Sequence, residues 1–271
     1  MPELPEVETT VRGLAVHLRG ARIERVRINR PDLRRPFPPD LVQVMTGARI
    51  TDLTRRAKYG LMHTDRDAVM IFHLGMSGRW RIEPEKEDRH DHLVLEAGGK
   101  RFALNDPRRF GSVDLVPLAA LEAFAPFAAL GPEPLGEGLD AGHLRCATKG
   151  RVQAIKLLLL DQRIVAGLGN IYVCEALWRA GIHPRKAGGK VTGPQLDRLI
   201  PAIRDVLTES IRAGGSTLRD FAGPDGQLGY FAKAFDVYGR TGEACHRNDG
   251  GTVRRIEQGG RSTWFCPKCQ R

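Results

Sequence analysis

The sequence predicts an α+β fold: a β-sandwich or barrel, then a helical region, then a short cysteine-bearing module. Three observations predict it. Apolar and polar residues alternate from Arg22 to about Pro117, helical spacing prevails beyond Gly138, and three of five cysteines lie near the C-terminus. The 271 residues are enough for one large domain or two ordinary ones.

The first element is a helix, followed by strands. Val7, Val11, Leu14 and Leu18 recur at the spacing of an amphipathic helix, and Gly20 ends it. Short alternating runs punctuated by Gly, Pro, Asp and Asn then predict five strands, at Ile23–Ile28, Leu61–His63, Val69–Leu74, Leu93–Glu96 and Val113–Val116.

The second half of the chain is helical. A stretch rich in Pro and Gly, Ala125 to Gly138, is typical of a domain connection. Beyond it, apolar residues predict helices that are followed by a small C-terminal module from about Val237. The predicted helices are Ala154–Leu160, Ile171–Ala180 and Gln195–Ala213.

Composition narrows the class of protein. The net charge of +10 and the pI of about 9.7 indicate a polyanionic partner. No apolar run reaches the length of a membrane span, and no secretion signal is visible. The odd number of cysteines, with Cys-Pro-Lys-Cys at the end, favours an intracellular metal site over a disulfide framework.

The N-terminus suggests amine chemistry. Removal of Met1 would leave Pro2 as a terminal secondary amine, which forms an iminium with an aldehyde-like sugar carbon. Glu3 and Glu6 lie close enough in sequence to move protons. The alternative is that Pro5 opens a helix whose N-terminus these glutamates complement, and the residues alone leave both interpretations open.

Motifs along nearly the whole chain carry a family resemblance. They are MPELPEVET at 1–9, RAKY at 56–59, HLGMSG at 73–78, HDH at 90–92, DPRRFG at 106–111, LGPEP at 130–134, GLGNIY at 167–172 and the C-terminal cysteines. In this order they resemble the formamidopyrimidine-DNA glycosylase family, the bacterial enzymes called Fpg or MutM.

The resemblance implies both architecture and activity. It implies a β-sandwich over 1–124, a helix–two-turn–helix domain over 125–232 and a finger hairpin over 233–271. The expected protein is a monomeric bacterial enzyme of the cytoplasm and nucleoid, acting on damaged double-stranded DNA. It would excise 8-oxoguanine and formamidopyrimidines as a DNA glycosylase and AP lyase, with Pro2 as nucleophile and Glu3 moving protons. β,δ-Elimination would then nick the strand in base excision repair.

The resemblance also implies which residues meet DNA. Lys58 and Arg261 match phosphate ligands beside the damaged nucleotide, whereas Asn170 and His90 match further phosphate contacts. Lys156 is expected to reach the lesion or a phosphate. Taken alone, these residues are equally typical of exposed cations, a helix N-cap and a snorkelling lysine. His73 is either another contact or an ordinary strand histidine.

Base flipping requires residues that fill the vacated stack. The resemblance makes Met76 and Phe110 the apolar wedge and Arg108 the side chain that faces the orphaned base. The alternative is that the Met and Phe are core residues and that Arg109 forms a structural ion pair. The glycines of Gly223 to Tyr230 predict a mobile lid over the lesion.

The C-terminal module departs from its family. Family members carry Cys-x2-Cys at both ends, but here Cys245 is followed by Asn248, while Cys266 and Cys269 are present. His246 adjoins Cys245, and Asp249 offers a carboxylate, so zinc binding stays open. We expect absent or substoichiometric zinc and a hairpin held by four apolar residues, Val253, Ile256, Trp264 and Phe265.

Two other functions are considered. A Nei-type endonuclease on oxidised pyrimidines shares the fold and mechanism, but Leu4 and the long lid favour the Fpg type. A non-catalytic basic finger protein would only bind nucleic acid, and the Pro2-Glu3 start argues against it.

Overall fold

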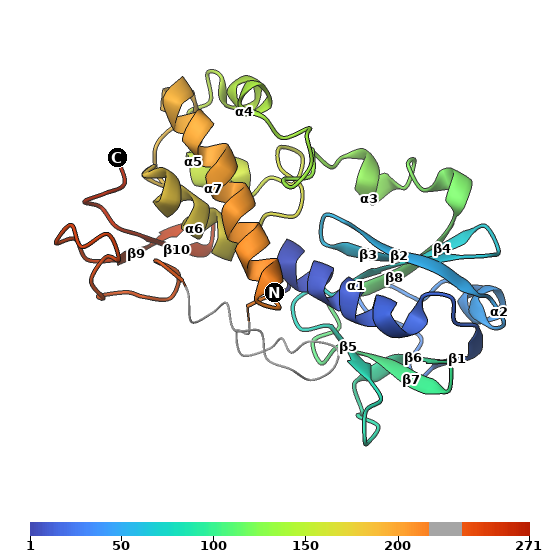
Figure 1. Cartoon of the computed structure of the whole chain (residues 1–271). Coiled ribbons are helices and arrows are strands. Elements are labelled where there is room, and N and C mark those ends of the chain that lie inside the picture. Colours follow the sequence, from blue (N-terminus) through green and yellow to red (C-terminus); the bar gives the residue numbers. More distant parts are fainter. Residues whose placement is uncertain (217–234) are drawn as a thin grey trace. The chain divides into compact units, whose positions relative to one another are not determined.

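The computed structural model describes residues 1–216 and 235–271 (Figure 1). These residues form two compact units. The first comprises Met1–Ala128 and the described residues 211–216, and the second comprises Ala129–Ser210 and residues 235–271. The three-domain division with boundaries near residues 124 and 232 stays a prediction.

The first unit contains two four-stranded antiparallel sheets, with strand orders β1-β6-β7-β5 and β2-β3-β4-β8. Their bounds are β1 Ile23–Ile28, β2 Ile50–Arg56, β3 Tyr59–Thr64, β4 Ala68–His73, β5 Arg79–Ile82, β6 Asp91–Ala97, β7 Lys100–Asn105 and β8 Ser112–Pro117. Buried Phe72 of one sheet packs edge-on against buried Trp80 of the other, with ring centroids 5.6 Å apart. The predicted α+β fold with an N-terminal β-sandwich is confirmed.

Helix α1, Leu4–Leu18, lies against strands of both sheets (Figure 1). Its apolar residues Val7, Val11, Leu14 and Leu18 are buried in the sandwich core, as the helical spacing predicts. The shorter helices of this unit are α2 Leu41–Met45, η1 Leu118–Ala120 and α3 Ala125–Ala128.

The second unit is helical apart from one hairpin. Its helices are α4 Ala141–Thr148, α5 Ile155–Leu159, α6 Asn170–Ala180, η2 Gly188–Lys190 and α7 Gly193–Arg212. The hairpin pairs β9, Arg254–Gln258, with β10, Arg261–Phe265. Gly259 and Gly260 connect them with φ of +56° and +70°, values that glycine adopts without strain. Among the described helices, none is both long and apolar enough to cross a membrane.

Candidate functional site

The residues that follow Met1 are buried. Met1 is 39% exposed, but Pro2 behind it is buried, and Glu3 and Glu6 are each 2% exposed. The Glu6 carboxylate accepts a hydrogen bond from the Glu3 backbone N–H at 2.9 Å, and others from the backbone N–H and hydroxyl of Ser216 at 2.9 and 2.8 Å. These bonds fix the backbone next to Pro2, so helix initiation and a positioned N-terminus are compatible interpretations.

Lys58 lies in the tight turn between β2 and β3 and is 8% exposed. The preceding Ala57 has a φ of +52°, a left-handed conformation that is unusual for a residue with a Cβ. Arg55 holds this turn because it donates to the Ala57 carbonyl and to Glu8 of α1, both at 2.9 Å. The turn that carries Lys58 is therefore bound to the helix that carries the N-terminus.

His73, at the end of β4, is a satisfied strand histidine. Its Nδ1 accepts from the Gly75 backbone N–H at 3.1 Å, and its ring lies 4.8 Å from that of Tyr59. Burial, reinforced by the charge of Lys58, lowers the pKa of His73 to about 4. Of the two roles that the sequence left open, the geometry favours the structural one.

The predicted wedge residues come from two loops that touch. A Cβ on Gly75 would lie 2.3 Å from the carbonyl carbon of Phe110, so the loop that bears Met76 approaches the other at backbone distance. Buried Asp106 holds both loops: its carboxylate accepts from the Ser77 hydroxyl at 2.6 Å and from the Gly111 N–H at 2.8 Å.

Arg108 and Phe110 of these loops have exposed side chains. Phe110 is 47% exposed, so it is no core residue, and the Arg108 guanidinium lies 4.9 Å from its ring centre. Met76 is half-buried. Arg109 forms an ion pair with Asp32 at 3.7 Å, which agrees with the structural role considered for it from the sequence. The half-buried His90 adjoins this group, since its carbonyl accepts from the Asp106 N–H at 3.0 Å.

In the second unit, the Ser262 carbonyl joins the helices to the hairpin. It accepts from the Asn170 side-chain amide at 2.9 Å and from the Lys156 ammonium at 3.3 Å. Lys156 also donates to the Thr263 hydroxyl at 2.7 Å and is completely buried. The structure therefore differs from the expectation that Lys156 reaches DNA, because its ammonium is enclosed against β10. Arg261, at the start of β10, is exposed.

Comparisons with known families cover most of the chain. The model of the formamidopyrimidine-DNA glycosylase N-terminal domain matches residues 1–113, and that of the formamidopyrimidine-DNA glycosylase H2TH domain matches residues 130–222. The chain belongs to the formamidopyrimidine-DNA glycosylase family. It is therefore an enzyme of DNA repair, in the class of DNA glycosylases whose members also have lyase activity.

Relatives agree along the full length. The chain is 69% identical to formamidopyrimidine-DNA glycosylases of Erythrobacter litoralis and of Novosphingobium aromaticivorans, with 100% of each chain covered. It is also similar to a Lactococcus lactis Fpg mutant in complex with a Fapy-dG containing DNA, with a TM-score of 0.92, 34% identity and full coverage of both chains. A complex of Lactococcus lactis Fpg with an abasic site containing DNA gives the same values.

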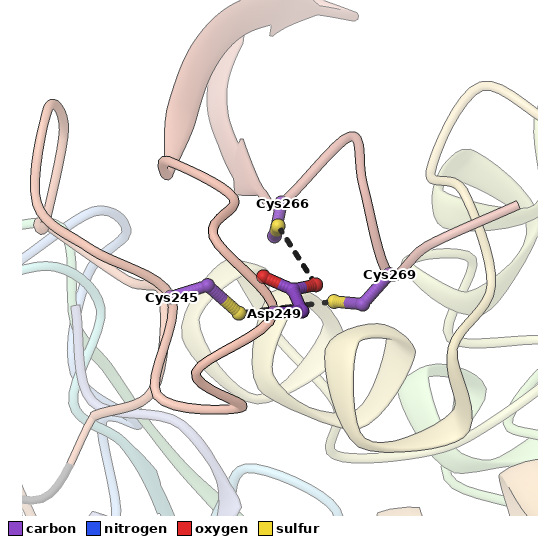
Figure 2. A group of neighbouring side chains, drawn as sticks. All are labelled: Cys245, Asp249, Cys266 and Cys269. Atoms are coloured by element: carbon purple, nitrogen blue, oxygen red, sulfur yellow. Dashed lines mark hydrogen bonds between the residues drawn. The ribbon is translucent and has the colours of Figure 1, made fainter.

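The C-terminal module contains a group of four side chains that could hold a metal ion. A model described as a zinc finger found in FPG and IleRS matches residues 250–271, which include Cys266 and Cys269 but neither Cys245 nor Asp249. In the structure these four side chains converge, and their ligand atoms all lie within 4.8 Å of one another (Figure 2). Three thiolates and a carboxylate are a donor set that zinc accepts.

Sequence reasoning missed the residues that hold the site together. Asp106 belongs to one of the sequence motifs, but the sequence does not show that its carboxylate accepts a hydrogen bond from Ser77 on the other loop. Ser216 has no sequence signal at all, because its partner Glu6 lies 210 positions away. The predicted lid, Gly223 to Tyr230, lies outside the described residues.

Proposed function

We propose that this enzyme excises oxidised purines, namely 8-oxoguanine and formamidopyrimidines, from duplex DNA through an N-terminal proline and then nicks the strand. The observation that carries the proposal is the fixed N-terminus: Pro2 and Glu3 are buried, and Glu6 holds the Glu3 backbone. A buried secondary amine next to a carboxyl group is suited to nucleophilic attack followed by proton transfer.

The reaction follows from these groups. After Met1 is removed, the Pro2 nitrogen attacks C1′ of the damaged nucleotide, and the bond from C1′ to the base breaks. The base leaves with the bonding electrons and takes up a proton from water. The amine proton passes to the Glu3 carboxylate, which then delivers it to O4′ as the C1′–O4′ bond breaks, so the sugar ring opens and leaves a C1′ iminium. Removal of a C2′ proton then expels the 3′ phosphate, a second elimination expels the 5′ phosphate, and water releases Pro2.

The remaining site residues would bind DNA. Lys58, Asn170 and Arg261 would bind phosphates, which position the duplex without selecting a sequence. Met76 and Phe110 would fill the space of the flipped nucleotide, and Arg108 would donate to the orphaned base. The exposure of Phe110 and Arg108 supports this assignment, since both side chains are available to a partner.

Zinc would serve this enzyme as a structural cross-link. Cys245, Cys266 and Cys269 would hold it, and it would stabilise the module that presents Arg261. The enzyme would act as a monomer in the bacterial cytoplasm, on nucleoid DNA.

Borohydride trapping tests the proposal. The protein is incubated with an 8-oxoguanine duplex and borohydride, which reduces an iminium to a stable amine, and the adduct is mapped by peptide sequencing. We expect the DNA to be linked to the Pro2 nitrogen. An adduct on Lys58 or Lys156 with Pro2 free, or no adduct while the base is released, would refute the mechanism.

A further inference from the structure

The metal-binding group differs from the family pattern in its second ligand. The family places a cysteine three positions after the first one, but this chain has Asn248 there, and Asn248 is exposed. We propose that Asp249, one position further on, supplies the fourth ligand of a zinc site completed by Cys245, Cys266 and Cys269. The proposal reverses the sequence-based expectation of absent or partial zinc.

Two distances between the ligand atoms are close to those around a tetrahedral ion. Two thiolates at about 2.3 Å from tetrahedral zinc lie about 3.8 Å apart, and a thiolate and a carboxylate oxygen lie about 3.5 Å apart. The sulfurs of Cys245 and Cys269 are 3.8 Å apart, and Oδ2 of Asp249 lies 3.9 Å from Sγ of Cys266. Figure 2 shows the Asp249 carboxylate pointing between the three cysteines.

The backbone accounts for the shift by one residue. Asn248 donates its N–H to the Cys245 carbonyl at 3.0 Å and has a φ of +51°, the left-handed conformation that asparagine tolerates better than most residues. This turn leaves the Asn248 side chain in solvent, and the carboxylate of the next residue enters the group.

Gly251 then orients the carboxylate. Its N–H donates to Oδ1 of Asp249 at 2.7 Å, which leaves Oδ2 as the atom that approaches Cys266. A Cβ on Gly251 would lie 2.5 Å from the Cys266 sulfur, so no other residue type fits there without displacing a ligand. Hydrogen bonds of this kind are the outer-shell contacts that orient metal ligands.

Two further contacts support this ligand set. Trp178 donates its indole N–H to the Cys245 sulfur at 3.4 Å, as expected of a donor beside a thiolate. His246 is engaged elsewhere, because its Nδ1 lies 3.0 Å from a carboxylate oxygen of Asp236. Among the described residues, Asp249 is thus the one oxygen or nitrogen ligand that accompanies the three cysteines.

X-ray absorption at the zinc edge of the unmodified protein tests the ligand set without any substitution. We expect one zinc per chain after gel filtration, with three sulfurs at about 2.3 Å and one oxygen at about 2.0 Å. Four sulfurs would overturn the proposal, since Cys174, which packs in the same apolar cluster, would then be the fourth ligand. The proposal would also be overturned if protein from cells grown in zinc-supplemented medium contained no bound zinc.

Substitutions test Asp249 itself, with chelator competition as the measurement. Asp249→Asn should weaken zinc binding by more than about tenfold, and Asp249→Cys should restore or exceed the parent affinity. Asn248→Gly is the matched control: it replaces the neighbouring residue, suits the positive φ, and should leave zinc binding unchanged. Equal zinc affinity in Asp249→Asn and the parent would refute the assignment. The test does not depend on glycosylase activity.

Discussion

The start of α1 and the loops around Phe110 are both assigned to the reaction, yet they are built in opposite ways. Glu3 and Glu6 are 2% exposed and bound by hydrogen bonds to the folded chain, whereas Phe110 is 47% exposed. Covalent chemistry requires a reacting group that is already in place, while a wedge must be free to enter a stack. Substitutions at the first region should therefore affect stability and chemistry together, and those of the exposed loop side chains should affect DNA recognition alone.

Loss of the terminal secondary amine should have the largest effect. Pro2→Gly, or a blocked N-terminus, should reduce base excision by about a hundredfold or more, the scale on which loss of one catalytic group acts. DNA binding should persist. Single-turnover excision assays and gel-shift titrations measure the two quantities. Pro5→Ala is the control, because it removes a proline from the same first turn and leaves the terminal amine. Unchanged excision by Pro2→Gly with a blocked amine would exclude Pro2 as nucleophile.

Acid should weaken the sandwich through His73. Its folded pKa of about 4 lies below the ordinary histidine value of 6.5, so the unfolded chain takes up the proton first. The contribution of neutral His73 to the free energy of unfolding is complete above pH 6.5. It is lost as the pH falls toward 4, by about 3 kcal/mol at most. His73→Asn should therefore lose less stability than the parent between pH 7 and pH 4, measured by urea unfolding.

The matched comparison for this prediction is His63→Asn on β3. Burial also lowers the pKa of His63, but that histidine is less deeply enclosed. Its substitution should change the pH dependence by a smaller amount. A pH dependence that His73→Asn leaves identical to the parent would contradict the assigned burial effect.

Removal of the Glu6 charge should loosen the N-terminus. Glu6→Gln keeps the shape but weakens the bonds from Glu3 and Ser216, and should lower the free energy of unfolding by about 2 kcal/mol. Excision should fall as well, because the backbone next to Pro2 is no longer held. Ser216→Ala removes only the hydroxyl bond and should lower stability by about 1 kcal/mol. Full stability and activity in Glu6→Gln would show that the N-terminal region does not need to be held by these hydrogen bonds, which would contradict its contrast with the exposed loops.

Arg108→Ala should have the smallest and most selective effect. Arginine offers donors and no acceptor, so it suits the acceptors of cytosine better than the exocyclic amine of adenine. Its loss should narrow the ratio of excision rates opposite C and opposite A by about five- to tenfold, with stability unchanged. Arg109→Ala, an exposed neighbour paired with Asp32, should leave the ratio as it is. An unchanged ratio in Arg108→Ala would place Arg108 outside the wedge.

The sequence predicted elements well where helical spacing or flanking turn residues mark them. Helix α1 was predicted within a few residues because its buried residues follow the helical period. Strands β1, β4 and β8 were predicted within a few residues because turn residues bound their short apolar-containing runs. Strands β2, β5 and β7 were not predicted. β5 reads Arg-Trp-Arg-Ile, in which charged side chains hide a strand that only its pairing with β7 establishes.

The order of the motifs along the chain determined the family, since that information is local and survives without coordinates. The exposure of Phe110, the burial of Lys156 and the contact of Glu6 with Ser216 were decided by the tertiary structure. So was the convergence of Asp249 with three cysteines, which a left-handed turn at Asn248 produces. Spacing in sequence reports which residues are available, but the backbone conformation and the packing around it decide which atoms meet.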